Sequence, residues 1–509
     1  MKVTRLISVL TAAFMAVSCS EKYFDVDSTD YLTGENAAQM VENDPEYLSS
    51  YISGLYSFMV QYNAGGTSGN EHDDFGFISC TMVGDWMAGD VVLHGSRGWG
   101  MYDYAFDYRN FNYKRPFQIW STFYTLINNA NTVIDFFQPG TDPQNISSRG
   151  YLGQAYAIRA MAYMYLILYF QDPMDGAGNF NYEAKGVPIV YASRDSKSAD
   201  TVSERQGRNT LRIVCEHIEE NINAALPLLE GYERPSKIML DKQTAEGIAA
   251  RYYLLTQQWE KAASMASDAR RGYTLMDEAR LHAGFMDIED AEVMWGFNHT
   301  SETQTTYASF FSQMSNDCPG YAGLDQLGKL IDRKLYEQIP ASDYRKSLFN
   351  GPSGGSPSVN AAAIASTLPY AARKFGFLDQ WLQDYVYMRA AEMYLIEAEA
   401  SLRLGKDSEA QSLMTELMAY RDPAWNKTVT LDEILLQRRI ELWGEGLSYY
   451  DRRRNSEGIV RSYEGTNHNL EFLTKIVDVP AHHKYWVFQI PERELQENPS
   501  ILPEDQNEL

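Results

Sequence analysis

Most of the chain carries the apolar spacing of amphipathic helices. In the segment 117–137, apolar side chains recur at intervals of three and four residues from Ile119 to Ile134. After a short turn the segment 151–170 repeats this pattern, which predicts a helical hairpin. By the same criterion, further helices are expected at 45–59, 211–229, 244–256, 259–271, 387–404, 408–420 and 431–445.

Several of these helices pair in the manner of tetratricopeptide repeats. The clearest copy runs from Ala249 and its neighbours into Trp259, and a second runs from Ala398 through the turn at Gly405 into Ala410. One such hairpin cannot bury its apolar stripe alone, so the copies should stack. The pattern therefore predicts an all-α fold of tetratricopeptide-like helical hairpins in a curved solenoid.

Segments without a helical period interrupt this frame and are expected to be large irregular loop insertions. They are rich in Gly, polar and aromatic residues, and they lie at 63–114, 298–377 and 458–485. Long ordered loops on a regular frame often carry function. Because no linker of disordered composition separates the insertions, we predict one domain at 19–509, with an N-terminal half at 19–235 and a C-terminal half at 236–509.

The N-terminus has the composition of an export signal. Lys2 and Arg5 precede a short apolar run, and small residues precede Cys19. We therefore predict a lipoprotein signal peptide at 1–18 and lipidation of Cys19, which would anchor the protein in a membrane. The alternative is an ordinary secretory signal in which Cys19 occurs by chance. After Cys19, no apolar run is long enough to span a bilayer.

Charge and cysteine content narrow the possible partners. The chain has 68 acidic and 44 basic residues, for a net charge of -24, which argues against nucleic acid as a partner. Three cysteines follow Cys19, and they could form one disulfide, although buried free thiols are the expected state: Cys80, Cys215 and Cys318.

The chain shows no recognisable catalytic or metal-binding motif. The acidic stretch at 71–74 lacks the alternating oxygen ligands of a calcium loop, and adjacent histidines such as His482 and His483 seldom bind metals in loops. We therefore predict no catalytic residues, no metal and no cofactor.

Five passages, in order along the chain, resemble those of the SusD/RagB family of outer-membrane nutrient-binding lipoproteins. They are GYLGQAYAIRAMAY at 150–163 with GVPI at 186–189, RAAEMYLIEAEA at 389–400, QRRIELWGEG at 437–446, YDRRR at 450–454, and IPERELQENP at 490–499. Gln154 and Gln437 stand where the family usually has Glu. The charged residues of the third passage are expected to form buried or half-buried ion pairs that fix the packing of the hairpins: Arg438, Arg439, Glu441 and Glu445.

The resemblance implies a tetratricopeptide-like all-α fold and a lipid-anchored position on the outer face of the outer membrane. The acidic residues that follow Cys19 (Glu21, Asp25 and Asp27) are similar to the signal that directs such lipoproteins to that face. It further implies a TonB-dependent outer-membrane transporter as partner, and the capture of oligosaccharides for import. In some relatives the ligand is a peptide. The alternatives are therefore a peptide-binding lipoprotein of the same fold and a structural lid of the transporter without its own ligand; an enzyme is the least favoured class.

A glycan site requires exposed aromatic rings beside polar side chains. The candidate rings lie in the irregular segments: Trp86, Trp99, Tyr102, Tyr104, Tyr307, Phe310 and Tyr321. The matching polar candidates are Arg97, Asp103, Asn298 and Gln304. Trp99 ranks first because glycines flank it on both sides. Four other tryptophans lie in regular or strand-like segments and are assigned to packing: Trp120, Trp259, Trp295 and Trp443.

Overall fold

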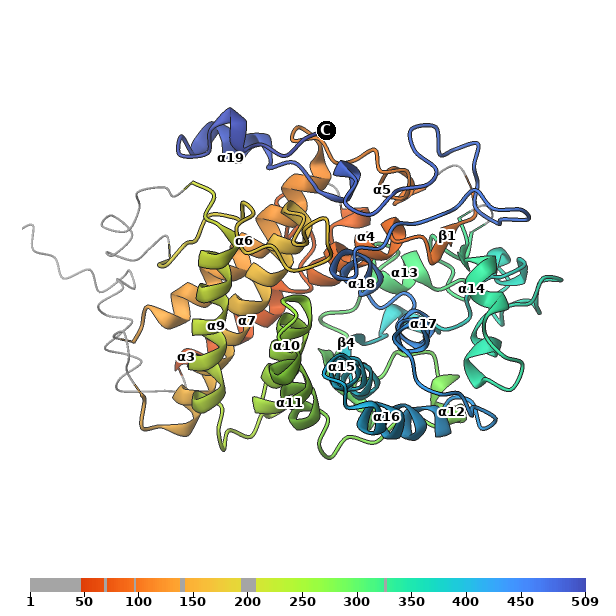
Figure 1. Cartoon of the computed structure of the whole chain (residues 1–509), viewed down its shortest axis with the longest axis horizontal. Helices are drawn as coiled ribbons and strands as arrows, with labels where there is room; N and C mark the ends of the chain where they lie inside the picture. The colour runs from red at the N-terminus through yellow and green to blue at the C-terminus, as the bar shows by residue number, and fades with distance from the viewer. Residues whose placement is uncertain (1–46, 68–70, 96–97, 138–141, 194–206, 325–326) are drawn as a thin grey trace, which may run out of the picture.

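The computed structural model describes residues 47–67, 71–95, 98–137, 142–193, 207–324 and 327–509. It confirms the all-α class, because helices dominate and the strands of the described residues form two short two-stranded sheets (Figure 1). The predictions for the signal peptide, Cys19 and Arg97 lie outside the described residues. Within those residues, no helix is both long and apolar enough to cross a membrane.

Long helices form a continuous frame in which most pack on the next one along the chain. In chain order they are α3 (Tyr47–Phe58), α6 (Lys114–Ile134), α7 (Ile146–Phe170), α9 (Leu211–Leu228), α10 (Lys242–Leu255), α11 (Trp259–Ala269), α15 (Ala390–Arg403), α16 (Asp407–Ala419) and α17 (Leu431–Glu441). Helix α6 packs on α7, α7 on α9, α10 on α11, α11 on α15, and α15 on α16, while α17 packs on α15. In Figure 1 this frame runs from α9 and α7 on the left, through α10 and α11, to α15 and α16 at the lower right.

Helix α7 is the centre of the frame. It begins at the cap residue Asn145, whose side chain accepts the backbone N–H groups of Ser147 and Ser148. From Gly150 onward, all of its residues except Tyr156 are buried. A helix enclosed in this way must satisfy its polar side chains internally.

Gln154, which stands where the family usually has Glu, lies in the enclosed part of α7. The side-chain oxygen of Gln154 accepts a hydrogen bond of 2.7 Å from the hydroxyl of Tyr56 on α3. The same oxygen accepts the backbone N–H of Leu240 at 3.3 Å. An amide oxygen therefore fills this position without burying a charge.

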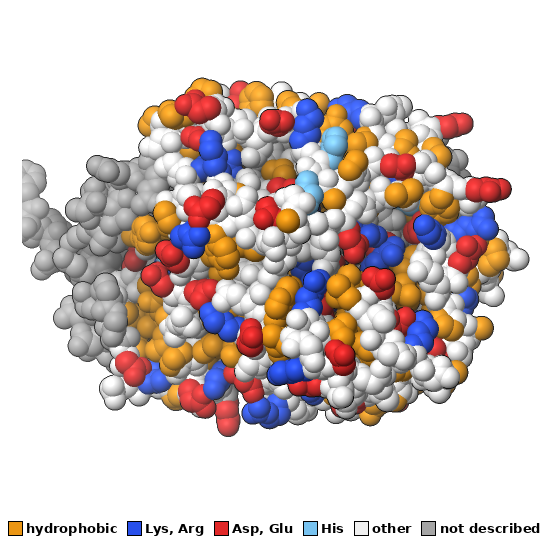
Figure 2. Space-filling model, in the orientation of Figure 1, with side chains coloured by type: hydrophobic (Ala, Val, Ile, Leu, Met, Phe, Trp, Pro, Cys, Tyr) orange, Lys and Arg blue, Asp and Glu red, His pale blue; other side chains and the backbone are white. Residues whose placement is uncertain are grey.

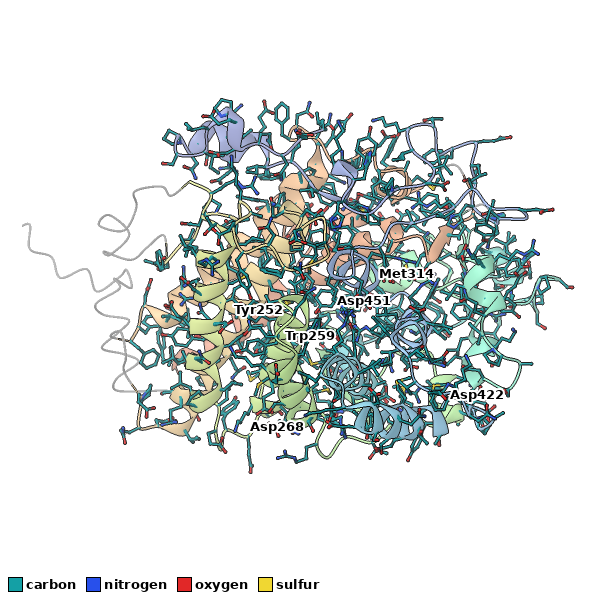
Figure 3. The ribbon with its side chains drawn as sticks, in the orientation of Figure 1. Tyr252, Trp259, Asp268, Met314, Asp422 and Asp451 are labelled. Atoms are coloured by element: carbon teal, nitrogen blue, oxygen red, sulfur yellow. The ribbon has the colours of Figure 1, made fainter. Side chains whose placement is uncertain are left out.

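The two predicted tetratricopeptide-like pairs are confirmed as α10–α11 and α15–α16. Ala249, Ala262 and Ala398 are fully buried, so the helix backbones approach closely, as their small side chains allow. Tyr252 and Trp259 are labelled in Figure 3 on the first pair. The Trp259 ring lies 4.8 Å below the guanidinium of Arg403, which connects α11 to α15.

The prediction that residues 63–114 form a loop is wrong in part. This segment contains α4 (Phe77–Met87), β1 (Val91–Leu93) and the short α5 (Met101–Tyr104). All residues of α4 are buried, so the helix has no exposed face that would place polar residues at a helical period. A helix buried on every side leaves no amphipathic pattern in the sequence.

The predicted start of a helix at Tyr387 is also wrong. Residues Tyr385–Arg389 form strand β4, and α15 begins only at Ala390. Strand β4 pairs antiparallel with β2 (Val293–Phe297), which confirms the strand-like interpretation of the run around Trp295. Strand β1 pairs antiparallel with β3 (Lys329–Ile331), so the first and second insertions lie side by side.

Short helices complete the fold around the insertions. They are α12 (Glu278–Leu281), α13 (Phe310–Met314), α14 (Arg333–Glu337), α18 (Ser448–Arg454) and α19 (Glu492–Glu497), with 3-10 turns at Glu71–Asp73, Tyr344–Leu348, Ile364–Thr367, Asp379–Trp381, Lys484–Trp486 and Pro503–Asp505. In Figure 1, α4, α5, β1, α13 and α14 occupy the upper and right parts of the molecule, beside the helical frame.

The charged residues of the motif at 437–446 are scaffold, as predicted. They lie wholly or partly in the interior and bind side chains of other elements rather than one another. The pairs are Arg438 with Asp451 of α18 (3.0 Å; Asp451 is labelled in Figure 3), Arg439 with Asp90 (2.5 Å), and Glu441 and Glu445 with Arg389 (3.0 and 2.6 Å). These ion pairs join α17 and the turn after it to α18, to β4 and to Asp90, the residue just before β1.

One further ion pair gives the fold a predictable acid sensitivity. The buried Glu399 on α15 accepts two bonds of 2.7 Å from Arg454 on α18. Burial by itself would raise the pKa of Glu399, but the charge and hydrogen bonds of Arg454 lower the pKa from 4.5 to about 2. Because the folded pKa is the lower one, Glu399 stabilises the fold above about pH 4.5, and this contribution is lost as the pH falls toward 2.

We therefore expect the free energy of unfolding of Glu399→Gln to fall less steeply than that of the wild type between pH 4.5 and 2. Urea denaturation at a series of pH values measures this slope. Parallel curves for the two proteins would show that Glu399 does not contribute to the acid sensitivity.

Candidate functional site

Four aromatic side chains meet at the surface, two from the insertion at 63–114 and two from the insertion at 298–377. We call them the aromatic platform: His72, Trp99, Tyr307 and Tyr321. The rings of His72 and Trp99 are stacked, with centroids 4.7 Å apart and an angle of 6° between planes. Tyr307 and Tyr321 lie 5.5 and 5.9 Å from the His72 ring, and 5.9 Å from each other. Tyr307 is 53% exposed, and the other three rings are half-buried.

Hydrogen bonds hold the platform rings in place. The His72 Nδ1 atom lies 2.5 Å from the Tyr321 hydroxyl, and the backbone oxygen of His72 accepts a bond of 2.8 Å from Gln313 on α13. Burial raises the pKa of Tyr321, and a hydrogen bond with the Trp99 side chain offsets part of this rise. The neighbouring loop is fixed by Tyr62, whose hydroxyl accepts the backbone N–H of Thr306 at 3.2 Å. The rings are thus arranged before any ligand binds, which lowers the entropy cost of binding.

A buried charge cluster supports the platform from below. Arg115 at the start of α6 donates to Asp103 at 2.9 and 2.8 Å and to Asp73 at 2.8 Å. Lys114 also pairs with Asp73, and its ammonium lies 5.4 Å over the Trp99 ring. Burial by itself would raise the pKa of Asp73, but the charges of Arg115 and Lys114 lower it below its usual value. Asp73 is therefore held as a paired anion.

The structure brings together three of the predicted rings: Trp99, Tyr307 and Tyr321. It adds His72, which in the sequence is part of the acidic stretch at 71–74. The sequence signal for His72 is weak, because its role depends on contacts with residues more than two hundred positions away, such as Tyr321. Tyr102, another candidate ring, is 51% exposed on α5.

Four other candidates lie in the core, and the expectation that they occupy exposed loops is wrong. Trp86 belongs to the enclosed helix α4, and Phe310 packs against Phe375 and Tyr385. Tyr104 is buried and hydrogen-bonded to His468, and Asp103 belongs to the charge cluster below the platform. Their local sequences are rich in Gly and polar residues, but tertiary contacts enclose their side chains.

The two remaining polar candidates are exposed. The Asn298 amide donates a bond of 2.9 Å to Asp384, next to the start of β4. Gln304 is exposed in the turn that leads to Thr306 and Tyr307. Gln304, three residues before Tyr307, therefore remains a candidate for a polar contact near the platform, and Asn298 remains an exposed polar candidate that is held by Asp384.

The cysteines and the adjacent histidines have structural surroundings. Cys80, Cys215 and Cys318 are buried free thiols, as expected. His482 bonds to Asp172 at 2.8 Å, and the side chain of His483 caps the turn at Tyr485. Among the described residues, no group of three or more His, Cys, Asp or Glu side chains is placed to hold a metal ion.

Charge is mixed over the visible face of the molecule. In Figure 2, acidic and basic side chains alternate with apolar ones across this face, and neither sign forms a continuous field. With a net charge of -24, such a face offers no continuous basic surface for nucleic acid.

A helical frame that displays an aromatic platform on inserted loops is an architecture suited to binding a ligand. A model described as "SusD family" matches residues 379–508, and one described as "Starch-binding associating with outer membrane" matches residues 84–254. The chain belongs to the SusD/RagB family. No curated protein sequence matches it significantly.

Solved structures show the same fold over almost the whole chain. A SusD-like carbohydrate binding protein from Bacteroides vulgatus has 24% identity and a TM-score of 0.75, covering 94% of this chain and 99% of its own. A SusD superfamily protein from Bacteroides thetaiotaomicron has 22% identity and a TM-score of 0.73, covering 94% and 100%. Surface glycan-binding protein A from Bacteroides uniformis has 19% identity and a TM-score of 0.65, covering 91% and 99%.

Proposed function

We propose that this protein is a cell-surface lipoprotein that binds an oligosaccharide on the aromatic platform and delivers it to a TonB-dependent outer-membrane transporter. The platform is the single observation that carries the proposal. The outer-membrane location is supported by the description of the family model and by the lipoprotein signal expected at Cys19. The transporter partnership rests on the family resemblance.

The chemistry of the platform suits a sugar. Aromatic faces carry partial negative charge, so they attract the polarised C–H groups of a pyranose ring. The Tyr307 ring is half-exposed, so its hydroxyl can bond to a sugar hydroxyl group. Exposed amides such as those of Asn298 and Gln304 can form the same kind of bond. This combination of rings and uncharged polar groups favours a glycan over a peptide, whose recognition relies on main-chain pairing.

The surroundings of the platform favour binding without catalysis. Glycoside hydrolysis requires two carboxyl groups beside the scissile bond, one of them able to donate a proton. Asp73 and Asp103 are the carboxylates directly below the platform, and both are buried against Arg115. Both carboxyl groups are buried, so neither can contact a glycosidic bond of a ligand that lies on the exposed rings.

We expect Trp99→Ala to raise the dissociation constant for the bound polysaccharide about tenfold or more, because it removes a ring contact and unstacks His72. The measurement is retardation in native gels that contain amylopectin, xylan, galactomannan, pectin or levan, followed by calorimetry with the retained polysaccharide.

The matched control is Tyr420→Ala, which removes a ring that is 39% exposed at the end of α16. This variant should be retarded as strongly as the wild type. Equal retardation of Trp99→Ala and the wild type would contradict the proposed site. Binding to peptides without binding to any polysaccharide would contradict the glycan class.

A further inference from the structure

A second set of aromatic side chains lies next to the platform, and we call it the tyrosine row: Tyr102, Tyr108 and Tyr113. The rings of Tyr102 and Tyr108 are stacked, with centroids 4.7 Å apart and planes at 18°. The ring centroids of Tyr108 and Tyr113 are 5.2 Å apart. Tyr102 is 51% and Tyr113 is 38% exposed, so the row presents apolar ring surface to solvent.

The segment that carries the row is held firmly. Arg109 is buried and donates to the backbone oxygens of Lys484 and Val487, both at 2.7 Å. The backbone N–H of Phe111 donates to the side chain of Gln489 at 3.1 Å. A rigid segment that nevertheless leaves rings exposed has the properties of a preformed binding surface.

The tyrosine row lies close to the Trp99 side of the aromatic platform. Tyr113 caps α6 and is followed directly by Lys114, whose ammonium lies 5.4 Å over the Trp99 ring. Burial raises the pKa of Tyr108, and the nearby charges of Asp103 and Asp73 raise it further. The row therefore lies beside the same charge cluster that supports the platform.

Charges next to the row are paired, so its surface suits an uncharged ligand. Asp107 pairs with Lys475, and Lys114 pairs with Asp73. The exposed Asn112 contributes an amide beside Tyr113, which can donate to and accept from hydroxyl groups. Stacked rings, neutral polar groups and paired charges together favour a neutral sugar chain.

We infer that the tyrosine row is a second glycan subsite, which binds the continuation of a neutral sugar chain whose first units lie on the aromatic platform. This inference rests on the proposed function and extends it: the protein selects chains long enough to occupy both surfaces. A short fragment fills the platform alone, whereas a long fragment also contacts the row and binds more tightly.

The test uses the full-length mature protein and two fragments of the polysaccharide that retards it in the native gels. For amylopectin the probes are maltotriose and maltoheptaose; for the other polysaccharides they are the fragments of three and seven sugars. For the wild type we expect the longer fragment to bind about tenfold more tightly. Tyr102→Ala and Tyr113→Ala should lose most of this gain, while their affinity for the shorter fragment stays within about twofold of the wild type.

Trp99→Ala should weaken the binding of both fragments, and Tyr420→Ala should weaken neither. If Tyr102→Ala and Tyr113→Ala bind both fragments like the wild type, the second subsite is overturned while the proposed function stands. The second subsite is likewise overturned, and the proposed function stands, if these variants lose only the association with a protein partner. If the wild type binds none of the five polysaccharides, the proposed function fails and the subsite falls with it.

Discussion

Glu441→Gln is expected to lower the free energy of unfolding by about 3–5 kcal/mol, because it removes one partner of a buried ionic network. The Glu441 carboxylate accepts bonds from three fully buried arginines, which come from the 3-10 turn Tyr344–Leu348, from β4 and from the loop between α16 and α17. They are Arg345 at 3.1 Å, Arg389 at 3.0 Å and Arg421 at 2.9 and 3.0 Å.

The expected loss of stability is large because the substitution leaves buried positive charge without its full compensating negative charge. Burial by itself would raise the pKa of Glu441, but the charges of Arg421, Arg389 and Arg345 lower it well below the usual value. The carboxylate is therefore charged at neutral pH, and a neutral amide leaves three guanidinium groups with less compensation. Uncompensated buried charge is more costly than the loss of a pair exposed to solvent.

Urea denaturation followed by circular dichroism measures this loss. The matched control is Glu337→Gln, which removes the same charge from a surface pair with Arg333 whose side chains are 54% and 38% exposed. The control should lose less than about 1 kcal/mol. Equal losses for the two variants would contradict the structural role of the buried network.

Gly100→Ala is expected to destabilise the fold by about 2–5 kcal/mol and to weaken glycan binding as well. Gly100 has φ of 87°, in the left-handed region that disfavours residues with a Cβ atom. A Cβ atom at this position would lie 2.4 Å from the Trp86 ring, which is fully buried. Because Trp99 directly precedes Gly100, relief of this clash would displace the platform.

Gly272→Ala separates the effect of the left-handed backbone conformation from the effect of the clash with Trp86. Gly272 has nearly the same φ, 86°, but a Cβ atom there would meet nothing within 4 Å. We expect this control to lose only the backbone contribution of about 1–2 kcal/mol and to bind polysaccharide normally. Urea denaturation and native gels measure both properties. If Gly100→Ala behaves like Gly272→Ala, the contact with Trp86 does not constrain the platform.

Much of the helical frame could be predicted because helices such as α6 lie between the core and the solvent, whereas the enclosed α7 is recognisable from its length and from the spacing of its small and apolar residues. In α6, the apolar side chains from Ile119 to Val133 face inward while others stay partly exposed, so the sequence alternates at the helical period. Helix α4 could not be predicted in this way, since all of its residues are buried. The pattern predicts a helix from Tyr387, within strand β4, because the apolar residues of the strand run directly into the pattern of α15.

The candidate site was predicted in part. Irregular segments without a helical period carry Trp99, Tyr307 and Tyr321. Tertiary contacts bring these three rings together around His72. Trp86 and Phe310 looked similar in the sequence but pack inside. Local composition therefore identified the segments, but it could not separate rings that support the loops from rings that face solvent.

The amino-acid pattern by itself determined the helical hairpins, the family and the scaffold role of the 437–446 motif, because periodicity and short motifs are local properties of the chain. Only the tertiary structure decided which rings are exposed and that His72 joins them. It also showed that Arg115 bonds to both Asp73 and Asp103 below the platform. Exposure and charge pairing depend on contacts between residues far apart in the chain, such as the bond from His72 to Tyr321, and no local window contains both partners.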